Sequence, residues 1–259
     1  GITKGDKKRP EATRTHSKLL GEIITALGIP ESPKSHRINL SDTLLHLNNN
    51  LLSEYIAGLY DADGCVYVRK KTGSSCIDLT TCSEQLARQL QLIFLRYSIH
   101  ARLRSKKTSK GIIKGNYDKW ILEIRGTEQI RKFNNNIKLK HPEKIKKLAE
   151  LCSQNKIYHS NVDVLPGVGE RLKKVLRNNK ISLRKSKWHK NLSTEGLKKI
   201  LSKVSIKDKE IKELRKLAFS DILWDKVVEI KEKSPSYNYV YDLTVENSHN
   251  FVVDGVLVH

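Results

Sequence analysis

The period of the apolar pattern changes repeatedly between residues 51 and 152, and this constrains the fold more than any other feature of the sequence. A helix is predicted after asparagines 48–50, with an apolar stripe formed by Leu52, Tyr55, Ile56 and Leu59. Ser83 can cap a second helix, whose buried stripe would be Leu86, Leu90, Ile93 and Phe94. Two more helices are predicted near 127–137 and 142–152.

Four segments between these helices alternate with period two, which is typical of strands. They are "CVYVRKK" (65–71), "CIDLT" (76–80), "ARLRSKK" (101–107) and "KWILEIRG" (119–126), and they pair naturally as two hairpins. The resulting order, α-β-β-α-β-β-α with an extra helix, predicts an α+β domain built on a four-stranded sheet. Residues 1–16 are polar and predicted to be loop, and "SKLLGEIITALGI" (17–29) is predicted to be a helix that stops at Gly28.

Alternation also assigns the two faces of the predicted sheet. One face, directed at the helices, carries Val66, Val68, Ile77, Leu79, Leu103, Leu122 and Ile124. The opposite face carries Tyr67, Arg69, Lys71, Asp78, Thr80, Arg102, Arg104, Glu123 and Arg125. Such a face is either an ordinary solvated surface or a surface that contacts phosphates and base edges in a DNA major groove. Because all four strands agree and arginine dominates, we favour DNA contact.

The net charge supports a polyanionic partner. Lysine and arginine total 49 against 28 acidic residues, a formal charge of +21, and nucleic acid is the first partner to consider. A generally lysine-rich proteome is the alternative. No apolar run approaches the roughly 20 residues of a membrane helix, so no membrane partner is expected. The four cysteines form no CxxC pair, which predicts neither zinc nor disulfides and fits a reduced, cytoplasmic setting.

Residues 153–223 are basic and mostly helical in pattern, so we expect a DNA-contacting region. "RKSKWHK" (184–190) places Arg184, Lys187 and Lys190 around an aromatic residue. "LPGVGERLKKVL" (165–176) allows either a helix-hairpin-helix turn, whose amides near Gly167 and Gly169 would meet a phosphate, or a plain loop that starts a helix. From residue 224 onward, strands are predicted in "DKVVEIKEK", "YNYVYDLTV" and "NFVVDGVLVH".

The helix that ends in "IAGLYDADG" (56–64) carries the strongest chemical signal. Asp61 and Asp63 lie at its C-terminal end, where the helix dipole is already negative, so carboxylates there need a cation. Oxygen ligands of this kind suit Mg²⁺, which keeps several waters and also binds phosphate oxygens. Ala57, Gly58 and Ala62 are small and would let another helix approach closely. Gly64 stands where a helix end favours a left-handed residue.

"IAGLYDADG" resembles the signature of the LAGLIDADG homing endonucleases, and the order of elements resembles that family's repeat. The resemblance implies a saddle-shaped four-stranded sheet, Mg²⁺-dependent double-strand cleavage of a specific DNA site, and motif helices of two repeats packed side by side. It implies a metal at Asp63, assisted by the carbonyl of Ala62, and a basic residue that is either Arg125 or Lys119. A lone repeat would dimerise through the Ala57–Gly58 face.

"VYDLTVENSHNFVVDG" followed by "VLVH" resembles the C-terminal splicing blocks of inteins. The resemblance assigns Asp242 and His249 to the first block and His259 to the position before the terminal asparagine that cyclises. The chain would then be the C-terminal portion of an archaeal-type intein, with an N-terminal portion and host exteins as partners. It lacks an N-terminal nucleophile, a second DADG motif and the terminal asparagine, so we expect that it cannot splice alone.

The expected domains are 1–50 (tail of a first repeat and linker), 51–152 (endonuclease repeat), 153–223 (basic helical region) and 224–259 (splicing strands). The alternative is a sequence-specific DNA-binding module that has lost catalysis. A third interpretation, a helix-hairpin-helix repair protein, is supported only by "LPGVG" and ranks below the other two.

Overall fold

The computed structural model of the chain describes residues 2–3, 12–13, 16–32, 34–69, 75–107, 118–154, 158, 163–181, 190–205, 207–225, 227, 229–234, 239, 243–253 and 255–258. The chain divides into two compact units, residues 1–160 and 161–259.

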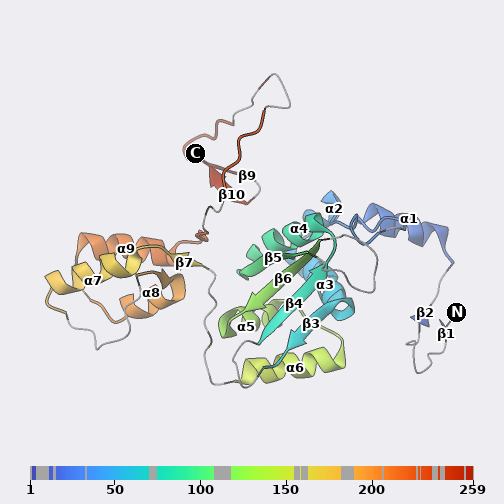
Figure 1. Cartoon of the computed structure of the whole chain (residues 1–259), viewed down its shortest axis with the longest axis horizontal. Helices are drawn as coiled ribbons and strands as arrows, with labels where there is room; N and C mark the ends of the chain where they lie inside the picture. The colour runs from blue at the N-terminus through green and yellow to red at the C-terminus, as the bar shows by residue number, and fades with distance from the viewer. Residues whose placement is uncertain are drawn as a thin grey trace. The chain divides into compact units, whose positions relative to one another are not determined.

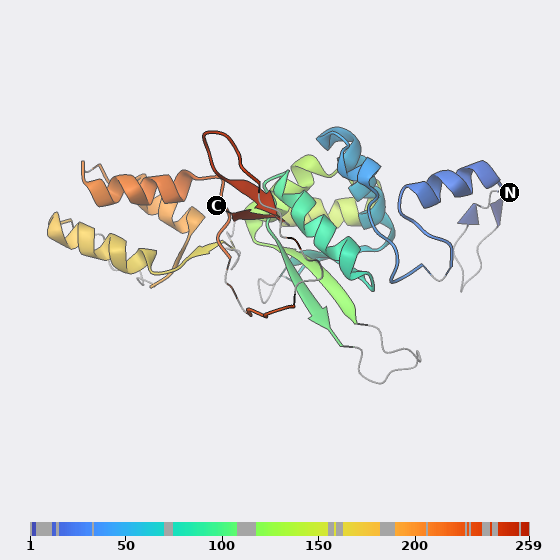
Figure 2. The same ribbon diagram turned by 90° about the horizontal axis from the view of Figure 1, so that it is seen from above.

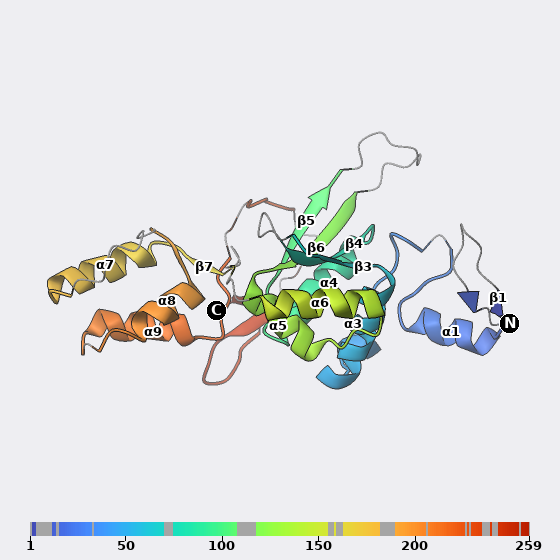
Figure 3. The same cartoon turned by 90° about the horizontal axis from the view of Figure 1, so that it is seen from below.

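The first unit is built on a four-stranded antiparallel sheet in the order β3-β4-β6-β5. Its strands are β3 (Gly64–Tyr67), β4 (Cys76–Thr81), β5 (Ala101–Lys106) and β6 (Lys119–Arg125). The helices are α3 (Asn49–Ala62), α4 (Glu84–Leu95), α5 (Thr127–Asn136) and α6 (Pro142–Ser153). They lie together on one face of the sheet (Figures 1 and 3), so none of these four helices covers the other face, which we call the open face. The predicted α-β-β-α-β-β-α order with an extra helix is confirmed.

The core lies between this sheet and its helices, as the alternation predicts. Val66, Ile77, Leu79, Leu122 and Ile124 are all buried on the helix side. In the helix layer, the ring of Tyr60 packs 5.0 Å from that of Phe133 and 6.0 Å from that of Phe94, between centroids. The side chains of Asn48 and Ser83 cap α3 and α4. Each accepts a hydrogen bond from the backbone N–H of the residue three positions later in the chain. Strands with one apolar face and helices with one apolar stripe can bury both only against each other.

Segments ahead of α3 are tied to the second helix of the repeat. The side-chain amide of Gln89 donates to the carbonyl of Leu40 and accepts its N–H, at 2.9 and 2.8 Å. Helix α2 (Asp42–Leu45) follows. The predicted helix at 17–29 is present as α1 (Lys18–Ala26) and ends before Gly28, whose φ is +101°. Residues 1–16 were expected to be loop, but β1 (Ile2–Thr3) pairs with β2 (Ala12–Thr13).

The second unit has its own core. Helices α7 (Val168–Asn178), α8 (Thr194–Leu201) and α9 (Lys209–Phe219) pack around Leu172, Leu197 and Leu214, each completely buried. The predicted helical character of this region is therefore found. Two short strands, β7 (Val164–Leu165) and β8 (Leu192–Ser193), pair ahead of α7 and α8 and were not predicted.

A terminal hairpin forms from β9 (Phe251–Val253) and β10 (Val256–Val258), with Gly255 at φ +81° in its turn (Figure 2). The strand expected at 225–233 is absent from the described residues of that segment. Val227 and Ile230 there are 72% and 87% exposed. A strand is stable only when it pairs and buries one face, and within the described residues these side chains find no such cover. No helix among the described residues is long and apolar enough to cross a membrane.

Gly64 is required by packing, which corrects the expectation that it adopts a left-handed conformation. Asp63 is the C-cap of α3, and Gly64 already begins β3. A Cβ on Gly64 would lie 2.7 Å from the carbonyl oxygen of Tyr60 and 2.8 Å from its Cα. A Cβ on Gly58, by contrast, would meet nothing within 4 Å.

We therefore expect opposite effects from two alanine substitutions in the same motif. Gly64→Ala should lower the free energy of unfolding by about 1–3 kcal/mol, because backbone must move. Gly58→Ala should raise it by about 1 kcal/mol, because alanine is the better helix former at an exposed position. Urea denaturation at low protein concentration, followed by circular dichroism, measures both. Equal stabilities of the two variants would contradict this account.

Candidate functional site

The C-terminal end of α3 is fastened to the N-terminal end of α6. The Asp61 carboxylate accepts the backbone N–H groups of Lys140 and His141, at 2.7 and 3.1 Å. In return, Lys144 Nζ donates to the carbonyls of Tyr60 and Asp61, at 2.8 and 2.7 Å. An anion at a helix start and a cation at a helix end are both favourable. The Asp61 carboxylate is thus bound by backbone amides, and Lys144 supplies positive charge to the carbonyls at the end of α3. Asp61 is therefore a structural residue.

Asp63 is held at the exposed tip of this helix. Its backbone N–H bonds to the carbonyls of Leu59 and Tyr60, whereas its side chain and that of Ala62 are exposed. The carboxylate therefore projects from a rigid element without being used to build it. This is the arrangement expected of a residue that binds a ligand.

The small residues of the motif divide between two faces of α3. Ala57 is only 1% exposed and belongs to the core, which corrects its assignment to a helix-packing surface. Gly58 and Ala62 are exposed, and Leu51, about two turns ahead of Gly58 on the same side of the helix, is 55% exposed. The face open to a second helix is therefore formed by Leu51, Gly58 and Ala62.

Sheet register separates the two candidate basic residues. Gly64 pairs with Leu79, and Leu79 with Leu122, so Asp63 lies level with Ile121 of β6. Arg125 lies four residues further along β6, about 13 Å at 3.3 Å per residue. Lys119 is exposed at the other end of β6, which is the end near Asp63. The register corrects the assignment of Arg125 beside Asp63 and leaves Lys119.

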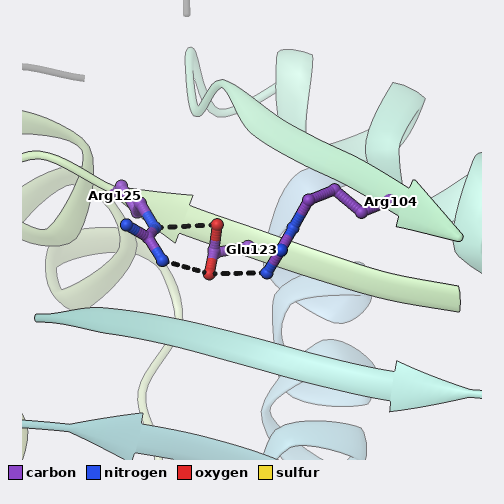
Figure 4. Close-up of polar contacts among 3 residues, drawn as sticks. All are labelled: Arg104, Glu123 and Arg125. Carbon is purple, nitrogen blue, oxygen red and sulfur yellow. Dashed lines mark hydrogen bonds and ion pairs between the residues drawn. The ribbon is translucent and has the colours of Figure 1, made fainter. Parts of the chain in front are cut away.

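Arg125 is instead part of a charge cluster on the open face (Figure 4). Arg125 Nη2 donates to Glu123 Oε1 at 2.8 Å, and Arg125 Nε forms an ion pair with Oε2 at 2.7 Å. Arg104 Nη2 approaches Oε1 of the same carboxylate at 3.2 Å. Glu123 is 3% exposed, although the face around it is open. Sequence analysis placed Glu123 on this face but missed its burial. The available signal was the alternation of Glu123 and Arg125 on one strand opposite the arginines of β5.

The two acidic residues of this face titrate in opposite senses. Burial alone would raise the pKa of Glu123, but the hydrogen bond and charge of Arg125, with Arg104 and Arg102, lower it below its ordinary value of 4.5. Asp78 lies directly across the sheet from Glu123. Burial, and then the charge of Glu123, raise the pKa of Asp78 above 3.8. One carboxylate is therefore stabilised in its ionised form and the other is not.

The other predicted DNA-binding residues of the sheet are accessible. Tyr67 is 39% exposed, Arg69 lies with its guanidinium 5.6 Å from the Tyr67 ring centroid, and Arg102 is exposed on β5. A hydrogen bond with Cys65, and then the charge of Asp78, raise the pKa of Tyr67 to about 12. Its hydroxyl is therefore protonated at neutral pH. Lys71 lies outside the described residues.

The glycine turn of the second unit does not offer its amides to a ligand. Gly167 N–H donates to the side-chain oxygen of Asn191 at 3.0 Å, and Gly169 N–H donates to the carbonyl of Lys190 at 3.0 Å. The helix-hairpin-helix interpretation is therefore wrong at these amides, which close the turn instead. The Lys190 side chain is exposed, and Arg184 and Lys187 lie outside the described residues.

Of the three predicted splicing residues, the structure describes one. His249 is exposed, has φ +52°, and donates its backbone N–H to the carbonyl of Val245, just ahead of β9. Asp242 and His259 lie outside the described residues.

The residues around Asp63 supply only some of the ligands that a magnesium ion needs. No group of three or more histidine, cysteine, aspartate or glutamate side chains able to hold a metal occurs in the described part of the chain. Asp63 and the Ala62 carbonyl nevertheless provide the hard oxygen ligands that Mg²⁺ prefers, and Mg²⁺ commonly uses only one or two carboxylates beside water and phosphate. The donor set therefore fits magnesium shared with a phosphate.

Comparisons with known proteins agree with this geometry. Residues 50–138 match the family model of the LAGLIDADG-like domain, which covers the motif helix, the whole sheet, α4 and α5. The chain thus contains a LAGLIDADG-like domain.

Curated relatives resemble the chain over a longer stretch. It is 29% identical over 248 residues to elongation factor 2 of Methanopyrus kandleri, a match that covers 92% of this chain and 18% of that protein. It is 26% identical to the DNA-directed RNA polymerase subunit Rpo1C of Methanocaldococcus jannaschii (95% of this chain, 28% of that protein). It is 33% identical over 148 residues to the ATP-dependent DNA helicase Hel308 of the same organism (55% and 12%). The chain spans less than a third of the length of each of these relatives.

The opposite pKa shifts of Glu123 and Asp78 predict opposite effects on stability. Glu123 has a folded pKa below its unfolded value, so its contribution is present above about pH 4.5 and is lost as pH falls through the folded pKa. Asp78 has a raised folded pKa, so its ionisation costs stability at neutral pH. At pH 7, Glu123→Gln should therefore be less stable than wild type and Asp78→Asn more stable.

Both differences should shrink as the pH falls toward 3, where the wild-type carboxyls become protonated. Urea unfolding at a series of pH values measures them. A pH-independent difference for Glu123→Gln would show that its effect comes from packing instead of charge.

Proposed function

We propose that this chain is part of a site-specific DNA endonuclease that makes double-strand breaks with Mg²⁺. The observation that carries the proposal is the placement of Asp63, an exposed carboxylate at the rigid tip of α3, beside a sheet whose open face bears four arginines, Arg69, Arg102, Arg104 and Arg125. The match to the LAGLIDADG-like domain supports it.

Each part of the domain has a role in this mechanism. The open sheet face contacts phosphates and base edges, which fixes the register of the duplex relative to α3. Asp63 and the Ala62 carbonyl would hold Mg²⁺, and the bound ion would supply activation of water and stabilisation of the leaving oxygen. Lys119, at the same end of the sheet, stabilises negative charge on the phosphate. Lys190, with Arg184 and Lys187, contacts the phosphate backbone of DNA.

A second motif helix is needed for a double-strand break, because one Asp63 can take part in cleaving only one strand. The exposed face formed by Leu51, Gly58 and Ala62 is the surface on which that helix would pack, supplied by another repeat or by a second copy of the chain. The small side chains there allow a close approach of the backbones. Two carboxylates would then lie together at the helix tips, one for each strand.

The proposal predicts that Asp63→Asn abolishes cleavage and leaves DNA binding nearly unchanged. The amide keeps the shape of the side chain but removes the charge that holds the ion. The probe is a duplex that the wild-type chain selects from a randomised library, incubated with and without Mg²⁺ and resolved on a denaturing gel. Asp61→Asn is the control that tests structure, since it should affect stability first.

Binding without cleavage by the wild-type chain would instead identify the alternative, a DNA-binding module without catalysis. The observation that favours this alternative is the single carboxylate at the tip of α3 among the described residues.

We also propose that the C-terminal segment belongs to an intein, with Asp242, His249 and His259 as splicing residues and host exteins as partners. The support is the resemblance of "VYDLTVENSHNFVVDG" and "VLVH" to splicing blocks, together with the comparisons. Segments similar to nine-tenths of this chain make up small parts of proteins named for translation and for transcription. An element inserted into unrelated host proteins would produce this pattern.

This second proposal predicts C-terminal cleavage once the cyclising residue is supplied. In a fusion with asparagine directly after His259 and a reporter domain after it, the reporter should be released, because the asparagine side chain attacks its own backbone carbonyl. Gel electrophoresis and mass spectrometry follow the release. His259→Ala should slow it, and alanine in place of the added asparagine should prevent it. Release that persists with that alanine would contradict the assignment, and so would no release even with an N-terminal partner present.

A further inference from the structure

The open face of the sheet contains two residues that oppose its positive charge, Asp78 and Glu123, and the Glu123 carboxylate is buried. A face that only attracted phosphates would gain from each positive charge and lose from each negative one. Burying a carboxylate is also costly unless it is paired. Glu123 satisfies this condition through Arg104 and Arg125, which come from neighbouring strands.

The contacts leave both guanidiniums able to bind a ligand. Arg125 uses Nε and Nη2 in a two-pronged pair with Glu123, so the plane of its guanidinium is fixed while Nη1 stays available. Arg104 contacts the carboxylate through Nη2 only. The two arginine side chains are 41% and 43% exposed, against 3% for Glu123. Glu123 thus lies between the two arginines (Figure 4), and the arginines are the exposed members of the cluster.

What the carboxylate adds to this face is orientation. A free arginine side chain loses rotamer entropy when a contact fixes it, and Glu123 imposes part of that loss already at folding. The orientation of the guanidinium matters little for binding a phosphate, because any nearby cation attracts it. It matters much for binding a base edge, because hydrogen bonds to the edge need a defined direction. The edge that matches a guanidinium is that of guanine, where O6 and N7 accept two hydrogen bonds.

We propose that Glu123 is a positioning residue that orients Arg104 and Arg125 to read guanines in the major groove of the DNA target. The inference rests on the proposed DNA-binding function and deepens it, since it separates the sequence-reading residues of the face from those that supply charge. It predicts that loss of a negative charge weakens discrimination between DNA sequences, although it should strengthen general attraction to DNA.

Asp78→Asn provides a matched control. Asp78 lies on the same face, directly across from Glu123 on the neighbouring strand, so the substitution removes the same charge from nearly the same place. Among the described residues, the hydrogen bonds and ion pairs of Arg104 and Arg125 go to Glu123 and none goes to Asp78.

The experiment uses the full chain at pH 7.5 without divalent metal, so that binding is measured without cleavage. Wild type first selects duplexes from a library with a randomised centre. The dissociation constants of wild type, Glu123→Gln and Asp78→Asn are then measured on a selected duplex and on a scrambled duplex of equal composition. We expect the ratio of the two constants to fall about tenfold or more in Glu123→Gln, the scale of one lost bidentate contact. Binding of the scrambled duplex should be unchanged or tighter. Asp78→Asn should keep the wild-type ratio.

A second measurement tests guanine itself. Replacing a selected guanine by 7-deazaguanine removes the N7 acceptor without changing base pairing. At one or more selected guanines this should weaken binding by wild type and Asp78→Asn, and have little effect on Glu123→Gln, because the contact is already lost. Unchanged wild-type affinity at every selected guanine would overturn the guanine assignment.

The outcomes separate the inference from the function on which it rests. If wild type selects no sequence, sequence-specific binding by this chain is wrong and the inference falls with it. If wild type selects a sequence and folded Glu123→Gln keeps the same ratio within twofold, only the inference is overturned. Should Glu123→Gln fail to fold, Glu123→Asp retains the charge with a shorter reach, and the same loss of discrimination is expected. An unchanged ratio in that variant would equally overturn the inference.

Discussion

The exchange of hydrogen bonds between the ends of α3 and α6 is the contact on which the candidate site depends. Asp61 satisfies amides ahead of α6, and Lys144 satisfies carbonyls at the end of α3. Helix ends leave backbone groups without partners, and here two opposite ends complete each other through one side chain each. The result is that the last turn of α3 cannot fray, and Asp63 immediately beyond it is presented from a fixed position. Gly64 then lets the chain turn into β3 in direct contact with Tyr60, which shortens the path from the helix tip to the sheet.

Charged side chains also determine the properties of the sheet. Its inner face is apolar and closed by helices, while its open face combines four arginines with two carboxylates. Asp78 and Glu123 face each other across β4 and β6, yet of the two only Glu123 forms ion pairs with guanidiniums among the described residues. This asymmetry explains why burial and charge move the two pKa values apart. It also divides the arginines of the face, because Arg104 and Arg125 are held through Glu123 whereas Arg69 lies over the ring of Tyr67.

Sequence periodicity was sufficient to predict the helices and strands from α3 to α6, because each strand there alternates cleanly and each helix carries one apolar stripe. It also placed Glu123 and Arg125 on the correct face. It could not predict that Asp61 and Asp63, two residues apart with identical side chains, have different roles, since that depends on the distant Lys140, His141 and Lys144. Nor could it show that Gly64 is required by contact with Tyr60 instead of by its backbone angles. In the second unit, apolar alternation at 225–233 predicted a strand. Alternation indicates a strand only where partner strands can pair with the segment.

The distribution of exposed apolar and small residues adds a last constraint. On α3, Leu52 and Ile56 are fully buried against the sheet, while Leu51, Gly58 and Ala62 on another side remain accessible. A helix with apolar or small residues on two sides is suited to a position between two layers, not at the surface of one. The same helix carries a single carboxylate at its tip, whereas a duplex has two strands to be cut. A second helix packed on Leu51, Gly58 and Ala62 would bury this surface and bring a second carboxylate to the tip. One packing contact would then complete both the apolar layer and the chemistry, which ties the cleavage mechanism to the assembly of two motif helices.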